Sequence, residues 1–142
     1  MKKIAIIYYS GTGNTEEMAK AILSGAQDAN GDVELFNISD ITSDDALAYD
    51  VLVLGCPAMG AENLEEGEFE PFMEEIEASL SGKDVALFGS YGWGDGEWMR
   101  TWQERVQDAG ANLVQDGLIC NETPDDEAIE ACKALGASVA SL

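Results

Sequence analysis

Short apolar runs alternate along the chain with segments in which apolar residues recur at helical spacing. Five runs rich in β-branched residues predict strands over residues 3–9, 33–36, 51–54, 85–88 and 113–119. The first, third and fourth runs are almost continuously apolar, as expected for strands that are buried on both faces of a parallel sheet. The pattern therefore predicts a parallel sheet at the centre of the molecule.

Helical patterns occupy the segments between these strands and follow the last of them. Apolar residues spaced i, i+3, i+4 and i+7 predict helices over residues 16–26, 69–80, 99–106 and 129–139. Residues 43–49 are long enough only for a short helix, with Ser43 or Asp44 as its N-cap. Five strands alternating with helices indicate an α/β fold, a doubly wound five-stranded parallel sheet with helices on both faces. No linker or repeat divides residues 1–142, which we expect to form a single domain.

The loop after the first predicted strand consists of small hydroxyl, amide and glycine residues. These are Ser10, Gly11, Thr12, Gly13, Asn14 and Thr15. A predicted helix follows directly, and the N-terminus of a helix carries partial positive charge that favours anions. No Lys or Arg lies between Ile4 and Ala19. Neutral donors in this arrangement favour a phosphate that anchors a ligand over one that is cleaved or transferred.

Two further loops follow predicted strands and, in a parallel sheet, open on the same edge as the first. One contains Pro57, Ala58, Met59, Gly60, Ala61 and Glu62, and the other contains Ser90, Tyr91, Gly92, Trp93 and Gly94. A Met59 thioether can contact an aromatic ring, and Gly60 permits a positive φ at which its peptide can flip. Trp93 lies between two glycines, which places it to stack on a planar group. A tight turn with Met59 in the core, and an incidental surface Trp93, are the structural alternatives.

Together the three loops predict a site for a planar heterocycle that carries a phosphate, which is flavin mononucleotide (FMN). The same loops, with residues 70–72 and above all 87–100, resemble the flavodoxins, in particular the short-chain flavodoxins of anaerobic bacteria. The resemblance covers the whole chain and implies a flavodoxin-like strand order of 2-1-3-4-5. It also implies a low-potential one-electron carrier that holds FMN non-covalently and is not an enzyme.

The resemblance assigns the first loop to the FMN phosphate. The side chains of Ser10, Thr12, Asn14 and Thr15 would bind it together with the loop backbone, while Ser90 would lie near the ribityl chain or the phosphate. Pro57 has no hydroxyl, so the phosphate contact that relatives make with a Ser at this position is absent.

The resemblance assigns the second and third loops to the isoalloxazine ring. Met59 and Trp93 would lie on its two faces, and Glu62 would accept a hydrogen bond from N3–H. The glycines on either side of Trp93 would lie near N1 and O2. The Gly60 carbonyl would turn toward N5–H in the one-electron-reduced flavin. Relatives often carry Asp or Ser where this chain has Ala61, which removes a polar contact from the turn.

Acidic residues outnumber basic ones by 28 to 7, and the net charge is −21. This balance disfavours nucleic acid and anionic membranes as partners, because both require basic surface. It favours positively charged protein partners, and solubility is the simpler explanation. Eight acids and no base lie from Glu62 to Glu77, beside the second loop. We expect part of this run to steer basic-faced redox proteins, such as low-potential oxidoreductases and ferredoxin-type partners.

The chain contains three cysteines without metal or redox spacing and no histidine, which disfavours metal sites and most hydrolase sites. An odd number of cysteines favours a reducing compartment. No apolar run approaches the ~18 residues of a membrane span, and the N-terminus lacks a signal-peptide cleavage site. We therefore expect a cytoplasmic monomer.

Charge also predicts the redox behaviour. Full reduction places negative charge on a flavin that already carries an anionic phosphate, with carboxylates and no nearby cation. The hydroquinone should be a strong reductant, and the neutral semiquinone should accumulate, so that the carrier shuttles between these two states. The alternative is an FMN-dependent quinone or nitro reductase, which needs a substrate site above the ring that a stacked Trp93 would block. A P-loop NTPase is excluded because no Gly-Lys-Ser/Thr follows Gly11 or Gly13.

Overall fold

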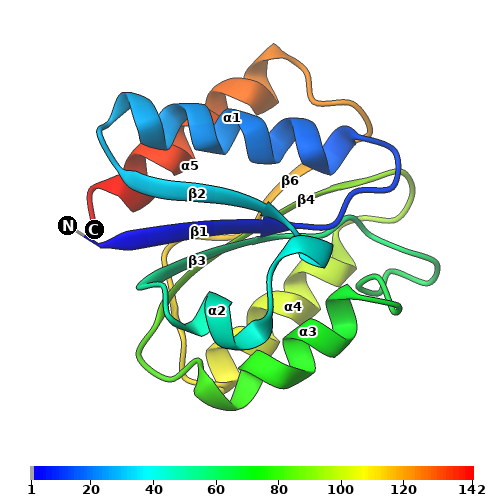
Figure 1. The fold of residues 1–142 in the computed structure, drawn as a ribbon. Coiled ribbons are helices and arrows are strands. Elements are labelled where there is room, and N and C mark those ends of the chain that lie inside the picture. Colours follow the sequence, from blue (N-terminus) through cyan, green and yellow to red (C-terminus); the bar gives the residue numbers. More distant parts are fainter. Residues whose placement is uncertain (1) are drawn as a thin grey trace.

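A parallel β-sheet lies at the centre of the computed structural model, which describes residues 2–142, and helices cover both of its faces (Figure 1). The strands are β1 (Lys3–Tyr8), β2 (Asp32–Asn37), β3 (Val51–Gly55), β4 (Asp84–Tyr91), β5 (Asn112–Leu113) and β6 (Leu118–Asn121). Their order is β2-β1-β3-β4-β5, with β6 also paired to β4, and the pairings are parallel. The predicted doubly wound fold and strand order are confirmed.

The fifth predicted strand, over residues 113–119, is interrupted, so the prediction of one continuous strand was wrong. β5 ends at Leu113 and β6 begins at Leu118, and both pair with β4. Between them the chain approaches helix α4 (Glu97–Asp108) so closely that a Cβ on Gly117 would clash with the Met99 side chain. The Gly117 N–H donates to the side chain of Gln103 instead of to a neighbouring strand. Contact with α4 therefore replaces strand pairing in this segment.

The remaining helices are α1 (Asn14–Asp28), α2 (Ser43–Leu47), α3 (Phe69–Ile76) and α5 (Asp126–Ala140), with short 3₁₀ turns η1 (Ile38–Asp40) and η2 (Glu77–Ser79). The predicted helix over residues 69–80 ends as the 3₁₀ turn η2. The predicted N-cap of α2, Ser43 or Asp44, was wrong by one or two residues, because Thr42 is the cap and its Oγ1 accepts from the Asp45 N–H at 3.1 Å. Within residues 2–142, no helix is long and apolar enough to cross a membrane.

Two apolar layers enclose the sheet. Helices α1 and α5 cover one face, and α2, α3 and α4 cover the other (Figure 1). Along β1, Ile4 and Ile6 pack in the first layer and Ala5 and Ile7 in the second, because neighbouring strand residues point to opposite faces. This explains the continuously apolar runs, since each residue of a central strand is buried on one side or the other.

Helices α1 and α5 approach each other through two glycines. A Cβ on Gly136 would clash with the backbone oxygen of Ile22, and a Cβ on Gly25 would clash with that of Lys133. The two helix backbones are therefore in direct contact. Because α1 begins at the end of the loop over residues 10–13, this contact also fixes the position of that loop.

Candidate functional site

The predicted loops meet at the carboxyl edge of the sheet, where they enclose a cavity of about 490 Å³. It is lined by Gly11, Thr12, Asn14, Pro57, Ala58, Met59, Ser90, Tyr91, Gly92, Glu122 and Thr123. Each of the three predicted loops contributes to this wall. An edge at which parallel strands end is where ligands bind in doubly wound sheets.

The first loop folds back on the start of α1 through its serine. Ser10 Oγ accepts from the backbone N–H groups of Gly13, at 3.1 Å, and Glu16, at 3.2 Å. Gly13 has a φ of 98°, a left-handed conformation that glycine adopts without Cβ strain. Ser10 thus shapes the loop, while Thr12 and Asn14 lie on the cavity wall.

Thr15 and Ser90 connect this loop to the sheet. Thr15 is only 1% exposed, and its Oγ1 accepts from the Ser90 N–H at 3.4 Å. Ser90 Oγ donates to the Glu122 carbonyl at 2.6 Å, so its hydroxyl hydrogen is already used within the protein. The Thr15 hydroxyl acts as the acceptor in this bond, which does not use its hydrogen.

The second loop contains a tight turn closed by Met59 and Asn63. Their backbones exchange two hydrogen bonds of 2.9 Å, and Gly60 and Glu62 between them have φ values of 47° and 58°. Met59 is half-buried on the cavity wall. The alternative in which Met59 belongs to the core is therefore excluded.

Glu62 and the Trp93 loop face each other. Within residues 2–142, the buried Oε1 of Glu62 has no hydrogen-bond partner. A Cβ on Gly94 would clash with this carboxylate, so only glycine permits the approach. Trp93 is 67% exposed, which excludes it from the core. An unpaired buried acceptor is costly, and it suits a ligand that donates an N–H, as a flavin ring does.

Comparisons with known proteins agree with this geometry. The family model described as flavodoxin matches residues 6–136. The chain belongs to the flavodoxin family. Flavodoxins of Clostridium beijerinckii and Megasphaera elsdenii are 52% and 47% identical to it; each alignment covers 96% of this chain, with 99% and 98% of the relatives.

The structural comparison gives the same result. The solution structure of two-electron reduced Megasphaera elsdenii flavodoxin has a TM-score of 0.90 and 48% identity, over 98% of this chain and 99% of that one. The crystal structure of oxidised flavodoxin 1 from Bacillus cereus has a TM-score of 0.86 and 32% identity, over 98% and 97% of the two chains. Flavodoxins bind FMN and carry electrons, so the predicted family, cofactor and electron-transport role are confirmed.

Sequence reasoning missed a fourth segment of this flavodoxin's cavity, formed by Glu122 and Thr123. Thr123 Oγ1 donates to Asn14 Oδ1 at 3.3 Å, and the Glu122 N–H donates to the Tyr91 carbonyl at 2.7 Å. The segment was missed because the last strand was predicted to end at residue 119, whereas β6 continues to Asn121. The polar run Asn121-Glu122-Thr123-Pro124 was the available signal.

No positive side chain of residues 2–142 lines the cavity. Within residues 2–142, neither Lys nor Arg lines it, and Glu122 is its only acidic residue. Cys56, just outside, is buried, and this burial raises the pKa of its thiol to about 12. Thiolate chemistry at Cys56 is therefore disfavoured at neutral pH, and a bound phosphate would meet neutral donors.

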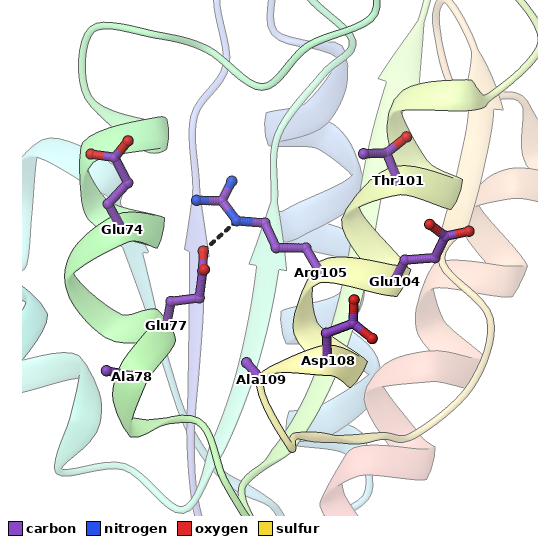
Figure 2. A pocket seen from close by; sticks show the side chains of 8 residues that line it. All are labelled: Glu74, Glu77, Ala78, Thr101, Glu104, Arg105, Asp108 and Ala109. Carbon is purple, nitrogen blue, oxygen red and sulfur yellow. Dashed lines mark hydrogen bonds and ion pairs between the residues drawn. The ribbon is translucent and has the colours of Figure 1, made fainter.

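A second cavity of about 720 Å³ lies between α3 and α4 and includes no residue of the predicted loops (Figure 2). Its wall carries the carboxylates of Glu74, Glu77, Glu104 and Asp108. Arg105 projects from α4 toward Glu77, to which it donates, and it also pairs with Glu70 at 2.6 Å. The guanidinium thereby joins α4 to α3, and the negative charge of the wall carboxylates disfavours a phosphate ligand.

Proposed function

We propose that this flavodoxin is a cytoplasmic, monomeric, low-potential electron carrier, with residues 1–142 as a single FMN-binding domain. In this proposal FMN passes between semiquinone and hydroquinone and serves basic-faced redox proteins, without catalysis of its own. The observation that carries the proposal is the cavity at the sheet edge, which within residues 2–142 is lined by donors of the three loops and by no Lys or Arg. The unpaired carboxylate of Glu62 lies on the second of these loops, against Gly94 of the third.

In this proposal the first loop holds the phosphate and the other two hold the ring. Thr12 and Asn14 donate from the cavity wall with the backbone at the start of α1, and Ser10 keeps that backbone in place. Met59 and Trp93 supply the two apolar contacts to the ring and exclude water from it. Glu62 accepts from the ring N–H, which satisfies its unpaired oxygen.

The charges of the wall support a low potential. Bound FMN supplies the reversible one-electron chemistry of its ring. In this chain neutral donors and the Glu122 carboxylate line the cavity, and within residues 2–142 no Lys or Arg does. The Glu62 carboxylate lies outside this wall, against Gly94 of the Trp93 loop. Additional negative charge is therefore opposed, and the opposition is strongest where the apolar side chains exclude water.

A visible absorption spectrum of the purified protein tests the core of this proposal. A bound-flavin spectrum, or one that appears when FMN is added, is the expected result. A colourless protein that rejects added FMN would overturn it. Oxidation of NAD(P)H by the protein alone would instead favour the quinone or nitro reductase, which no feature of the cavity favours.

Gly60→Ala is expected to lower the potential of the oxidised/semiquinone couple and to reduce the semiquinone yield. No atom lies within 4 Å of a Cβ built on Gly60, so the effect is one of backbone conformation and not of crowding. At positive φ a Cβ restricts ψ to a narrow range, which opposes a flip of the following peptide by about 1–3 kcal/mol. A redox titration measures the effect, and the potential of the semiquinone/hydroquinone couple should change less. An unchanged semiquinone yield in Gly60→Ala would exclude the flip.

Reversing two exposed acids, Glu68 and Glu75, to Lys is expected to slow electron transfer to a basic-faced oxidoreductase at low salt. Glu68 makes no side-chain bond at the start of α3, and both residues are exposed. Steered association gains about 10–10³-fold in rate and fades as salt rises, so parent and variant should converge at high salt. Stopped-flow measurement over a salt series checks this. Rates that ignore both salt and charge reversal would assign docking to another surface.

A further inference from the structure

The loop that carries Met59 and Glu62 rejoins the rigid part of the molecule at Glu65. Glu65 Oε1 accepts from the backbone N–H groups of Glu68 and Phe69, at 2.7 and 2.9 Å, and Oε2 accepts from that of Gly67 at 2.7 Å. The N-cap position of α3, Glu68, has no capping side-chain bond of its own. The Glu65 carboxylate therefore satisfies the free N–H groups at the start of α3, which a helix otherwise leaves unpaired.

The same residue is also attached to the sheet. The Glu65 N–H donates to Cys56 Sγ at 3.4 Å, and the Cys56 N–H donates to the Phe88 carbonyl in β4 at 3.1 Å. The loop thus leaves the sheet at Cys56, and its far end at Glu65 is bonded back to the same residue. Between these points the chain runs out to the turn and back, with its two ends held together at the base.

The turn itself has few attachments. Its own closure is the pair of backbone bonds between Met59 and Asn63, and two of its residues, Gly60 and Glu62, have positive φ. The buried Oε1 of Glu62 has no partner within residues 2–142, so this oxygen is not held in place by a bond to the protein. The position of Glu62 against Gly94 consequently depends on the loop backbone. That backbone is held at its base and on either side of the turn, where the Ala58 N–H donates to the Ser90 carbonyl at 3.1 Å and Leu64 is buried in the core.

The chemistry of the Glu65 contacts suits a strong attachment. Burial raises the pKa of Glu65, but the backbone N–H bonds from Phe69, Glu68 and Gly67 outweigh this effect and hold the pKa below its ordinary value. The side chain is therefore a carboxylate at neutral pH, and bonds to a charged acceptor are stronger than neutral ones. A Cβ on Gly67 would lie 2.8 Å from Glu65 Oε2, so glycine at this position leaves room for the carboxylate.

We propose that the Glu65 side chain positions the flavin ring, because it sets the location of the turn over residues 59–63 by joining the base of the loop to the start of α3. The backbone N–H of the same residue holds that base to Cys56, and this bond does not depend on the side chain. This proposal rests on the proposed FMN function. Glu65 does not touch the ring. It acts through Met59 and Glu62, and its loss allows the turn to move away from the position in which both contact the ring.

The test compares Glu65→Ala with Glu66→Ala, which removes the same side chain and the same charge at the next, exposed position. FMN and riboflavin affinities are measured by fluorescence titration of the folded apoproteins. For Glu65→Ala both ligands should bind about tenfold or more weakly, by nearly equal factors, because the ring is common to both. Glu66→Ala should change either affinity by less than about twofold. The potential of the oxidised/semiquinone couple should shift in Glu65→Ala and not in Glu66→Ala.

Three outcomes decide the proposal. Equal flavin affinities in Glu65→Ala and Glu66→Ala would contradict the proposal. A lower melting temperature of Glu65→Ala with unchanged flavin affinity would also contradict it, because Glu65 would then act only as a helix cap. If Glu65→Ala does not fold, Glu65→Gln decides by the same criterion, since its amide oxygen still accepts from the start of α3 while its NH₂ group opposes the Gly67 N–H. A parent protein that rejects both ligands would instead overturn the proposed function.

Discussion

Replacing Thr12 and Thr15 together with Ala is expected to weaken FMN binding by more than tenfold while riboflavin binding changes little. Thr12 lies on the cavity wall, and the Thr15 hydroxyl accepts from the Ser90 N–H through its oxygen, a bond that does not use its hydrogen. Hydrogen bonds to charged groups are worth about 1.5–3 kcal/mol each. Within residues 2–142, no Lys or Arg on the wall replaces them. Riboflavin lacks the phosphate and therefore does not depend on these donors.

Parallel titrations of the apoprotein with FMN and riboflavin measure this effect. Thr12→Ser keeps the hydroxyl and should bind FMN nearly as the parent does. Thr12→Ala alone is the cleaner single change, since Thr15 also accepts from the Ser90 backbone. Equal losses for the two ligands would show that the loop over residues 10–15 does not bind the phosphate.

Gly136→Ala is expected to destabilise the protein by about 1–3 kcal/mol. The added Cβ would clash with the Ile22 backbone oxygen, so helices α1 and α5 would have to separate. In an isolated helix the same change has the opposite sign, because Ala is favoured over Gly by about 1 kcal/mol. Destabilisation would therefore report the contact between the two helices and not helix propensity.

Urea unfolding of the apoprotein measures this difference. Ser138→Ala lies on the same helix at an exposed position and should change stability by less than about 0.5 kcal/mol. Gly25→Ala adds a Cβ on the facing helix, and we expect a loss similar to that of Gly136→Ala. Stabilisation by Gly136→Ala would mean that the helices lie further apart in solution than in this structure.

The sheet was predictable because its central strands are buried on both faces, which leaves a continuous apolar record in the sequence. The break in the last strand was not predictable in the same way. The pattern predicts one strand over Leu113, Val114, Leu118 and Ile119. The strand is broken because Gly117 contacts Met99, which lies in helix α4. Apolar pattern reports burial, but it does not report which neighbour provides it.

The candidate site shows the same limit. Its three loops were predictable from glycine and small polar residues after buried strands, whereas Glu122 and Thr123 depended on the true end of β6. Glu65 was one of eight acids in a run and looked like a surface charge. In the folded protein its carboxylate accepts three backbone N–H bonds at the start of α3. Charge reversal at Glu65 would therefore disturb the structure as well as the steering of a partner.

The contrast between the tryptophans gives this flavodoxin two optical reporters. Trp93 is 67% exposed at the proposed ring site, whereas Trp98 and Trp102 are 2% and 1% exposed in the core. A flavin stacked on Trp93 would quench its long-wavelength emission, while the shorter-wavelength emission of the buried pair would report on the packing around α4. Cofactor loss and unfolding of the core would therefore be distinguishable by emission wavelength in a single fluorescence spectrum.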